Sequence, residues 1–416
     1  MRLSHLFTKT RKSAPADEQA KNAQLLSRAG FIHKEMAGVY AYLPLGLRVL
    51  ENIKHIVREE MDGVGGLEVQ MTVLQPKDIW EKTNRWDDKV VDNWFKTKLV
   101  NGTELGVGFT HEEPMVDALK DFVSSHKDLP ISVYQIQNKF RNELRAKSGL
   151  LRGREFVMKD MYSFARSQDE HTEVYEKIAA AYGRVYDRLG IGDITYRTYA
   201  DGGVFTERFS DEFQTLTPIG EDTIYVHEGK KIAINKEVYT DENLAKLGLK
   251  KEDLVEKRGV EVGNIFPLES KYSDALDLYY VDERGEQQSI IMGCYGIGVS
   301  RLMGVLAELS SDEKGLVWSD TVAPARVYLA RLGDDAAVVT AADELYETLI
   351  QRNISVLYDD RDMRPGEKFA DADLIGCPHR VVISTRTVSE NKVEYKSRQG
   401  EAAEILTYEA LLVKLV

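Results

Sequence analysis

The sequence predicts a chain of two or three domains, in which a large part that mixes helices and strands precedes a small α/β domain. Its 416 residues are enough to build several hydrophobic cores. Alternating side chains indicate paired strands at 131–143 and 156–164. After Pro324 the order becomes strand, helix, strand, helix, strand, at 326–332, 335–351, 354–358, 367–375 and 380–384.

The first long helix is predicted at 45–62, where Leu50, Ile53 and Val57 share one face. A strand follows at 67–73, with alternating apolar residues. The pattern fits a core element and a dimer interface equally well. We also expect a helix at 171–190, a strand at 289–292 and a helix that opens at Gly296.

One face of the strand at 131–143 is polar along its whole length, with Gln135, Lys139, Arg141 and Glu143 on it. Such a face either meets bulk water or forms the floor of a ligand site. The segment 221–258 is a short charged insertion in which no chemistry can be recognised.

The composition excludes several classes of protein. The net charge of −13 argues against indiscriminate nucleic-acid binding, although local cationic patches are compatible with a tRNA partner. Two cysteines and scattered histidines predict no disulfide framework, no zinc site and a cytoplasmic location. No apolar run is long enough to cross a bilayer, so no membrane partner is expected.

A cationic turn lies between Glu143 and Phe156 and contains four basic residues, Arg145, Lys147, Arg152 and Arg154. Arginine forks suit phosphate oxygens, and Phe156 offers a flat surface for a purine. The alternatives are a solvated turn and a core phenylalanine, which are the commoner roles for each feature alone.

A glycine-rich segment, Gly293 to Arg301, joins a predicted strand to a predicted helix. It departs from the dinucleotide-binding fingerprint because Arg301 stands where that pattern needs glycine or alanine. Gly296 and Gly298 would let the backbone approach a nucleotide, and Arg301 would add a cation. The alternative is a tight turn with a surface arginine.

Thr110 and Glu112 stand two residues apart, so on extended chain their side chains share a face that can grip an ammonium group. The alternative, compatible with the first, is a helix capped by Thr110 with Glu112, Glu113 and Pro114 in its first turn.

Taken together, these segments resemble the three signature motifs of class II aminoacyl-tRNA synthetases, and the chain resembles the bacterial prolyl-tRNA synthetase family over nearly its full length. The resemblance rests on Thr110-His111-Glu112, on Phe140 to Glu143 with Arg152 to Phe156, on Met292 to Gly298 with Arg301, and on Asp359 to Arg361 with Arg364 to Gly366 in the tail.

The resemblance implies an α+β catalytic domain with an antiparallel sheet, at 1–220 and 259–320, and an anticodon-binding α/β domain at 325–416. The segment 221–258 would replace the large editing domain of many relatives. The implied activity is a ligase that joins L-proline to tRNA(Pro) with ATP and Mg²⁺, as a homodimer. The second possibility is a non-catalytic, synthetase-like tRNA-binding protein.

Matching positions assign roles to individual residues. Arg141 would hold the α-phosphate and the proline carboxylate, and Arg301 would act with it in catalysis. The other assignments are Thr110, Glu112, Met158 and Cys294 for proline; Glu143, Arg152, Phe156, Gly296 and Gly298 for ATP; and Arg361 and Arg364 for the anticodon. A loop in which aspartates such as Asp359 pair with these tail arginines is an equal alternative.

Three departures from the family pattern stand out. Thr72 replaces a proline, Thr206 and Glu207 replace a pair of glycines, and Asp211 replaces a histidine in a wall of the pocket. The missing editing domain has a consequence, because a proline pocket rejects alanine by only about 1–3 kcal/mol. We therefore expect a separate protein to clear alanyl-tRNA(Pro).

Overall fold

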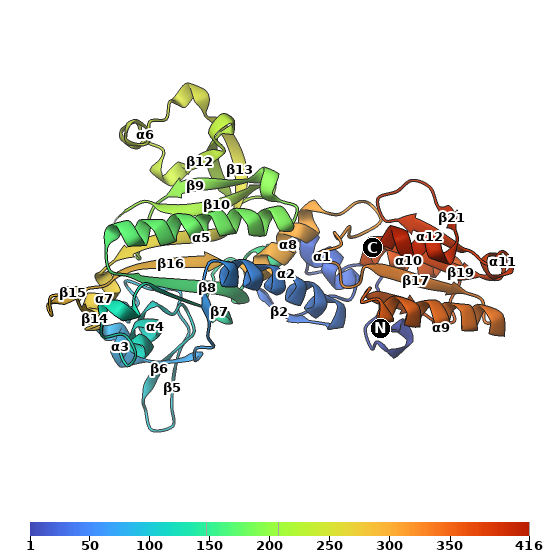
Figure 1. Ribbon diagram of the computed structural model, residues 1–416, viewed down its shortest axis with the longest axis horizontal. Coiled ribbons are helices and arrows are strands. Elements are labelled where there is room, and N and C mark those ends of the chain that lie inside the picture. The colour runs from blue at the N-terminus through green and yellow to red at the C-terminus, as the bar shows by residue number, and fades with distance from the viewer. Residues whose placement is uncertain (147, 207, 416) are drawn as a thin grey trace. The chain divides into compact units, whose positions relative to one another are not determined.

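The computed structural model describes residues 1–146, 148–206 and 208–415. The chain divides into two units, one made of residues 1–53, 147–151 and 303–416 and the other of residues 54–146 and 152–302. Figure 1 shows the elements of both. The predicted residues Lys147 and Glu207 lie outside the described part of the chain.

The second unit is built on a nine-stranded sheet in the order β10-β9-β12-β11-β13-β16-β8-β7-β3. Neighbours run antiparallel except in the pairs β9–β12 and β3–β7, which confirms the predicted antiparallel class. The strands are β3 (Leu67–Glu68), β7 (Ile131–Phe140), β8 (Glu155–Ala165), β9 (Thr195–Ala200), β10 (Ser210–Leu216), β11 (Asp222–His227), β12 (Ile232–Asn235), β13 (Val255–Glu269) and β16 (Ile291–Ile297).

Helix α5 (Gln168–Arg188) lies along one face of this sheet (Figure 1). Strand alternation turns Lys159 toward that helix, where its Nζ donates to Tyr182 at 2.6 Å. The alternate residues of the same strands, such as Asp160 on β8 and Cys294 on β16, face the opposite side, which we call the site face.

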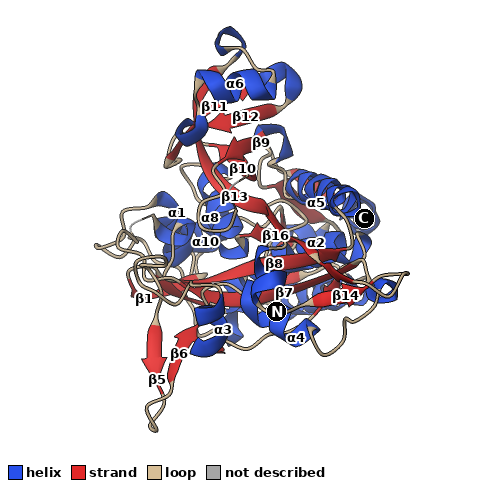
Figure 2. Ribbon diagram, turned by 90° about the vertical axis from the view of Figure 1, so that its left-hand side faces the viewer, coloured by secondary structure: helices blue, strands red, loops and turns tan. Residues whose placement is uncertain are grey.

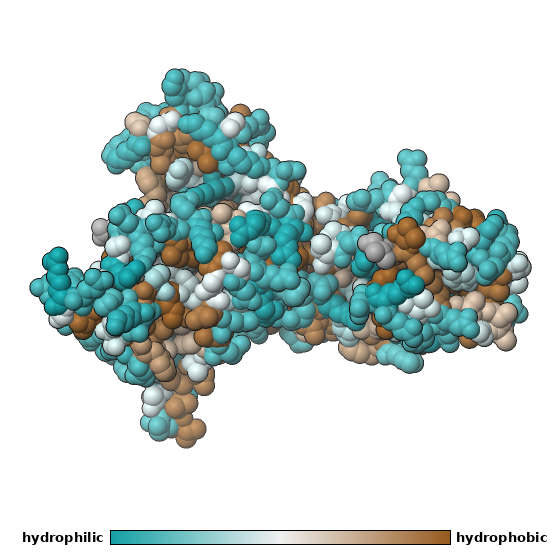
Figure 3. Space-filling model, in the orientation of Figure 1, coloured by the Kyte–Doolittle hydropathy of each residue, from teal (hydrophilic) through white to brown (hydrophobic). Residues whose placement is uncertain are grey.

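Smaller elements surround the site face at one end of the sheet. They are β4 (Leu74–Pro76), α3 (Lys77–Lys82), β5 (Lys96–Lys98), β6 (Glu104–Val107), α4 (Glu112–Leu119), α7 (Lys271–Ala275), β14 (Tyr279–Val281) and β15 (Gln287–Ser289). Apolar residues gather at the tip of the β5–β6 hairpin (Figure 3), where Leu99 and Val100 are exposed.

The segment 221–258 folds onto the main sheet. Strand β11 pairs with β13, and β12 pairs with β9. Helix α6 (Asp241–Leu247) covers them at the end of the sheet, as Figure 2 shows. Two strands of the central sheet therefore come from the segment in which the sequence showed no chemistry.

The first unit contains the predicted α/β tail. Its five-stranded sheet has the order β18-β17-β19-β20-β21, with parallel pairing in the first three strands. The elements are α1 (Lys21–Arg28), β1 (Ile32–Met36), β2 (Val39–Tyr42), β17 (Val327–Leu332), α9 (Ala336–Gln351), β18 (Val356–Asp359), α10 (Pro365–Ile375), β19 (His379–Ser384), α11 (Thr385–Ser389), β20 (Val393–Ser397), β21 (Glu404–Leu406) and α12 (Tyr408–Leu415).

Most of the helices and strands predicted from the sequence are present. Two helices, α2 (Pro44–Gly63) and α8 (Val299–Leu309), contain residues of both units. The prediction that a helix opens at Gly296 is wrong. Strand β16 continues through Gly296, which pairs with Asn264 on one side and Asp160 on the other, and α8 begins only at Val299. The strand expected at 67–73 pairs with β7 only at Leu67 and Glu68.

Within the described residues, no helix combines the length and the apolar character needed to cross a bilayer.

Candidate active site

The first part of the site is a buried acidic group at the start of α4. Glu112 is fully buried, and Thr110 Oγ1 donates to its two carboxylate oxygens at 2.9 and 2.8 Å. Cys294 Sγ, from β16, donates to Glu112 Oε1 at 3.2 Å. Thr110 does not cap the helix, because His111 occupies the N-cap position. The structure thus brings together Thr110, Glu112 and Cys294, as predicted from the sequence.

Arg85 holds this acidic group in place, and no sequence pattern pointed to it. Its Nη1 donates to Glu112 and Glu113 at 3.1 Å each, and Arg85 is only 1% exposed. Its guanidinium lies over the rings of Trp80, Phe205 and Tyr272. Burial raises the pKa of Glu113. Two carboxylates share one cation, so an incoming ammonium group would add the missing positive charge.

A buried polar network lies under the Thr110–Glu112 segment. Tyr162 OH accepts from the His111 backbone N–H at 3.0 Å and donates to Asp160 at 2.8 Å. Lys139 Nζ lies 2.6 Å from the other Asp160 oxygen. Burial, aided by the Lys139 charge, lowers the pKa of His111 to about 4, so its ring is neutral at pH 7. This network fixes the backbone that carries Thr110 and Glu112.

The second part of the site is cationic and involves Arg141 and Arg301. Arg301 Nη1 donates to the Glu261 carbonyl at 2.6 Å and to its carboxylate at 3.1 Å. Burial lowers the pKa of Arg141, and the charge of Arg301 lowers it further, whereas Glu261 opposes the shift. Arg141 is thus close enough to Arg301 and Glu261 for their charges to act on it.

Arg141 is positioned by aromatic rings and keeps a free donor. Its guanidinium carbon lies 5.0 Å from the ring centre of Phe109 and 5.4 Å from that of Phe156. Among the described residues, its Nε is buried without a hydrogen-bond partner. An unpaired buried guanidinium N–H is costly unless a ligand accepts its hydrogen bond.

Two arginines of the cationic turn donate to acceptors on Glu143 and Glu221. Arg152 donates to Glu143 and to Glu221, at 2.9 Å in each case, and Arg154 Nε donates to the Glu143 carbonyl at 3.0 Å. Arg145 is exposed. Near the turn, a Cβ at Gly296 would lie 3.3 Å from Met158 Cε, so glycine keeps the floor open beside Met158.

A second acidic group lies on the site face near Arg301 and was not predicted. It contains Glu212, Asp222 and Glu261, with Gln214 donating to Glu212 and Asp222 at 2.8 Å. Burial and the Glu261 charge raise the pKa of Glu212 to about 8. Carboxylate oxygens suit Mg²⁺. Within the described ranges, no three His, Cys, Asp or Glu side chains are arranged so that they could hold a metal ion.

The departures from the family pattern fall outside the acidic and cationic groups. The Thr72 carbonyl accepts from His111 Nε2 at 3.0 Å, a contact that a proline could also make. Asp211 faces α5, where it binds Tyr175 and Arg197. Thr206 is buried. In the tail, Arg361 makes ion pairs with Asp359 and Asp371, and Arg364 is exposed beside α10.

Comparison with known proteins agrees with this geometry. The family model of the tRNA synthetase class II core domain (G, H, P, S and T) matches residues 95–310, and that of the anticodon binding domain matches residues 326–416. The first match covers most of the sheet that carries the site and defines a class II synthetase core.

Similar proteins of known name indicate which family of class II synthetases the chain belongs to. The chain is 37% identical over 432 residues to the proline–tRNA ligase of Anaplasma marginale, with 100% of both chains covered. It is 37% identical over 426 residues to that of Rickettsia rickettsii, with 99% of each covered. Prolyl-tRNA synthetase from Cryptosporidium parvum, solved with L-proline and AMP, shares the fold with a TM-score of 0.76 at 16% identity, over 94% of this chain and 73% of that chain. The chain belongs to the proline–tRNA ligase family.

Proposed function

We propose that this protein activates L-proline with ATP and transfers it to tRNA(Pro). The observation that carries the proposal is one sheet face with a buried acidic group around Glu112 and a cationic group of Arg141 and Arg301. An amino acid bound between these two groups would direct its ammonium to the acidic group and its carboxylate to the cationic group.

The first chemical step is then an attack of the proline carboxylate oxygen on the α-phosphorus of ATP. A new bond forms between carboxylate oxygen and phosphorus, and the bond to pyrophosphate breaks. Arg141 would hold both reacting groups, because a guanidinium carries several N–H donors and its Nε has no partner among the described residues. Positioning and charge neutralisation carry the step.

In the second step, a ribose hydroxyl at the tRNA terminus attacks the prolyl carbonyl, and AMP leaves. We assign tRNA binding to residues 325–416, with Arg361 and Arg364 as candidate anticodon contacts. Arg361 would have to exchange Asp359 or Asp371 for a base, whereas Arg364 is already exposed.

The remaining contacts with ATP are assigned by the chemistry of each side chain. Arg152 and Arg301 would hold the outer phosphates, Glu143 and Phe156 the adenine, and Gly296 and Gly298 would leave room for the nucleotide. Mg²⁺ would enter with ATP and meet the oxygens of Glu212 or Glu261. The ion would neutralise phosphate charge during the displacement.

The specificity for proline rests on the apolar wall beside Glu112. Burial raises the pKa of the Cys294 thiol, so at pH 7 it is a neutral, apolar neighbour. Together with Met158 it would pack against the pyrrolidine ring. Such a wall cannot expel alanine, so we propose that a separate protein clears alanyl-tRNA(Pro), in the cytoplasm where tRNA is charged. We further propose a homodimer and the domain limits 1–220 with 259–320, 221–258, and 325–416.

Amino-acid-dependent pyrophosphate exchange across the twenty amino acids tests the proposal. We expect exchange with proline and a weaker signal with alanine. Exchange with threonine but without proline would contradict the specificity, and no exchange at all would favour the non-catalytic tRNA-binding protein. A second assay incubates the pure protein with alanyl-tRNA(Pro), and we expect no enzyme-dependent deacylation.

A further inference from the structure

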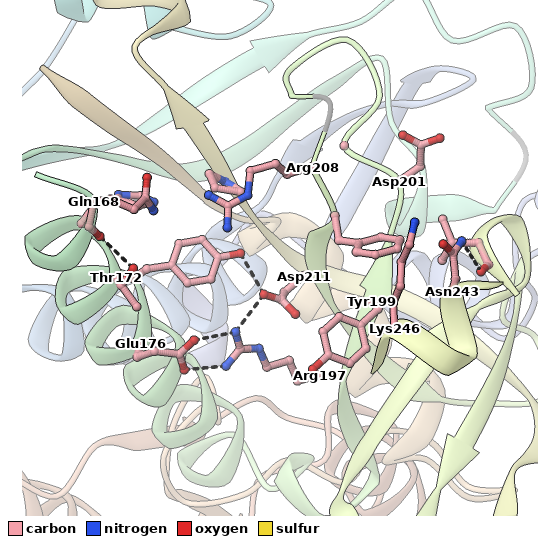
Figure 4. A pocket seen from close by; sticks show the side chains of 16 residues that line it. Gln168, Thr172, Glu176, Arg197, Tyr199, Asp201, Arg208, Asp211, Asn243 and Lys246 are labelled. Carbon is pink, nitrogen blue, oxygen red and sulfur yellow. Dashed lines mark hydrogen bonds and ion pairs between the residues drawn. The ribbon is translucent and has the colours of Figure 1, made fainter. Parts of the chain in front are cut away.

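A cavity of about 630 Å³ lies on the α5 side of the sheet, away from the site face. It is bounded by α5, β9, β10, the segment that joins β9 to β10, and α6 of the segment 221–258. Its volume is in the usual range for small-molecule sites. Figure 4 shows it from close by. We call it the rear cavity.

Two buried polar atoms in the rear cavity lack partners. Asp211 is 6% exposed and His171 is 2% exposed. Tyr175 OH and Arg197 both bind Asp211 Oδ2, at 2.9 and 2.8 Å. Within the described part of the chain, Asp211 Oδ1 and His171 Nδ1 have no hydrogen-bond partner. Figure 4 shows Asp211 among the side chains that line the cavity, with one oxygen joined to Tyr175 and Arg197 and the other joined to no side chain drawn.

The charges of the rear cavity favour a cation. Arg197 is shared between Glu176 and Asp211. Arg208 pairs with Glu269, and Lys246 pairs with Glu242. The lining itself carries three carboxylates, Glu176, Asp201 and Asp211, and three cations. Glu242 and Glu269 lie outside the lining but neutralise two of those cations, so the lining with its ion-pair partners carries three cations and five carboxylates. The aromatic rings of Tyr175, Tyr199 and Phe209 also line the cavity and suit the body of an organic cation.

We propose that the rear cavity binds a small organic ammonium ion with an aromatic or aliphatic body. The ammonium group donates to Asp211 Oδ1 and to His171 Nδ1, and the body packs against Tyr199 and Phe209. This gives the segment 221–258 a function, since Val238, Asn243 and Lys246 supply one wall of the cavity.

The site is coupled to the amino-acid site through the segment that joins β9 to β10. Gly202, Arg208 and Phe209 of this segment line the rear cavity. Phe205, from the same segment, packs on Phe266 with ring centres 4.6 Å apart and lies 4.9 Å from the Arg85 guanidinium, which holds Glu112. A ligand that displaces Phe205 through its contacts with Arg208 and Phe209 therefore changes the affinity for proline. This coupling rests on the proposed function, whereas binding in the rear cavity does not.

Calorimetry on the whole protein, without ATP, proline or tRNA, tests binding with tyramine and with tyrosol, in which a hydroxyl replaces the ammonium group. We expect tyramine to bind about tenfold more tightly than tyrosol, and Asp211→Asn to remove that difference. Arg208→Gln removes a competing cation and should tighten tyramine binding severalfold, a gain that misfolding cannot mimic. Arg386→Gln, an exposed change in the other unit, is the matched control.

Equal binding of the two compounds, no binding of tyramine, or indifference to both cavity variants would overturn the proposal. The coupling is tested by measuring proline affinity at rising tyramine concentrations. We expect a change that levels off when the rear cavity is full. An apparent proline affinity that falls without limit would place tyramine in the amino-acid site, and an unchanged affinity would refute the coupling.

Discussion

Arg85 Nη1 lies 3.1 Å from Glu112 Oε2 in an interior where both side chains are almost fully buried. The same nitrogen also reaches Glu113. A buried carboxylate that is to bind an ammonium group must stay charged while the site is empty, and a nearby guanidinium makes that possible. The pair therefore supports the proposed ammonium site, in which Arg85 would keep Glu112 charged without touching the amino acid.

Replacing Arg85 with methionine removes the only cation that contacts these two carboxylates among the described residues. Because buried charges then lack a partner, we expect the free energy of unfolding to fall by about 3–5 kcal/mol. Arg85→Lys should lose less. Urea denaturation followed by tryptophan fluorescence measures the change. Arg386→Met, at an exposed position, is the control, and equal stability of the two methionine variants would contradict the prediction.

Glu112→Gln keeps the shape of the proposed ammonium site and removes its charge. Loss of a charge-assisted hydrogen bond of about 1.5–3 kcal/mol predicts a rise in the KM for proline of about 10- to 150-fold. The KM for ATP should change little, since Glu112 lies at the other end of the site. Steady-state pyrophosphate exchange measures both constants, and Glu173→Gln on the exposed side of α5 is the control. A proportional rise in both KM values would argue against an ammonium contact.

Arg301→Lys keeps the charge but loses the planar fork that donates to Glu261. If this fork neutralises the phosphates during the displacement, kcat for exchange should fall by about 10²–10³-fold. The thermal midpoint should shift little, because Arg301 is a partly exposed residue. Full exchange activity in this variant would remove Arg301 from the mechanism.

The sequence predicted the fold well wherever periodicity decides it. Strands β7 and β8 follow from alternation, and α2 follows from the spacing of Leu50, Ile53 and Val57. Gly296 was misassigned because glycine usually marks a turn. Here it lies in the ladder between β13 and β8, where only tertiary pairing keeps the strand extended.

The site was predictable only in part. Thr110 and Glu112 are neighbours in sequence, so their shared face could be inferred. Arg85 is 27 residues away from Glu112 and follows no local pattern, so nothing in the sequence joins the two. For Arg361, the pair with Asp359 was one of the two alternatives drawn from the sequence and is present, whereas the second partner, Asp371, lies in the following helix and was not predicted.

Tyr162→Phe tests the network that positions the Thr110–Glu112 segment. The change leaves the buried N–H of His111 without its acceptor and Asp160 without one donor. We expect a loss of about 1–3 kcal/mol in stability and a higher KM for proline. Tyr279→Phe, whose hydroxyl makes only a 3.5 Å contact, is the matched control. A loss of stability without any change in KM would assign Tyr162 to the core alone.

Glu212 predicts a pH dependence of stability. Its pKa is raised in the folded protein from 4.5 to about 8, first by burial and then by the Glu261 charge. Below pH 4.5 the carboxyl is protonated in both states, and its contribution to stability is fully present. As the pH rises toward 8, the unfolded chain releases this proton and the folded chain keeps it, so the contribution is lost.

Glu212→Gln should therefore be more stable than the unmodified protein at pH 9, and the difference should shrink toward pH 5.5. Thermal midpoints across this range measure it, with Glu173→Gln as the control. Parallel pH profiles of the unmodified protein and Glu212→Gln would show that Glu212 is ionised in the folded state, because only a protonated carboxyl makes the two curves diverge.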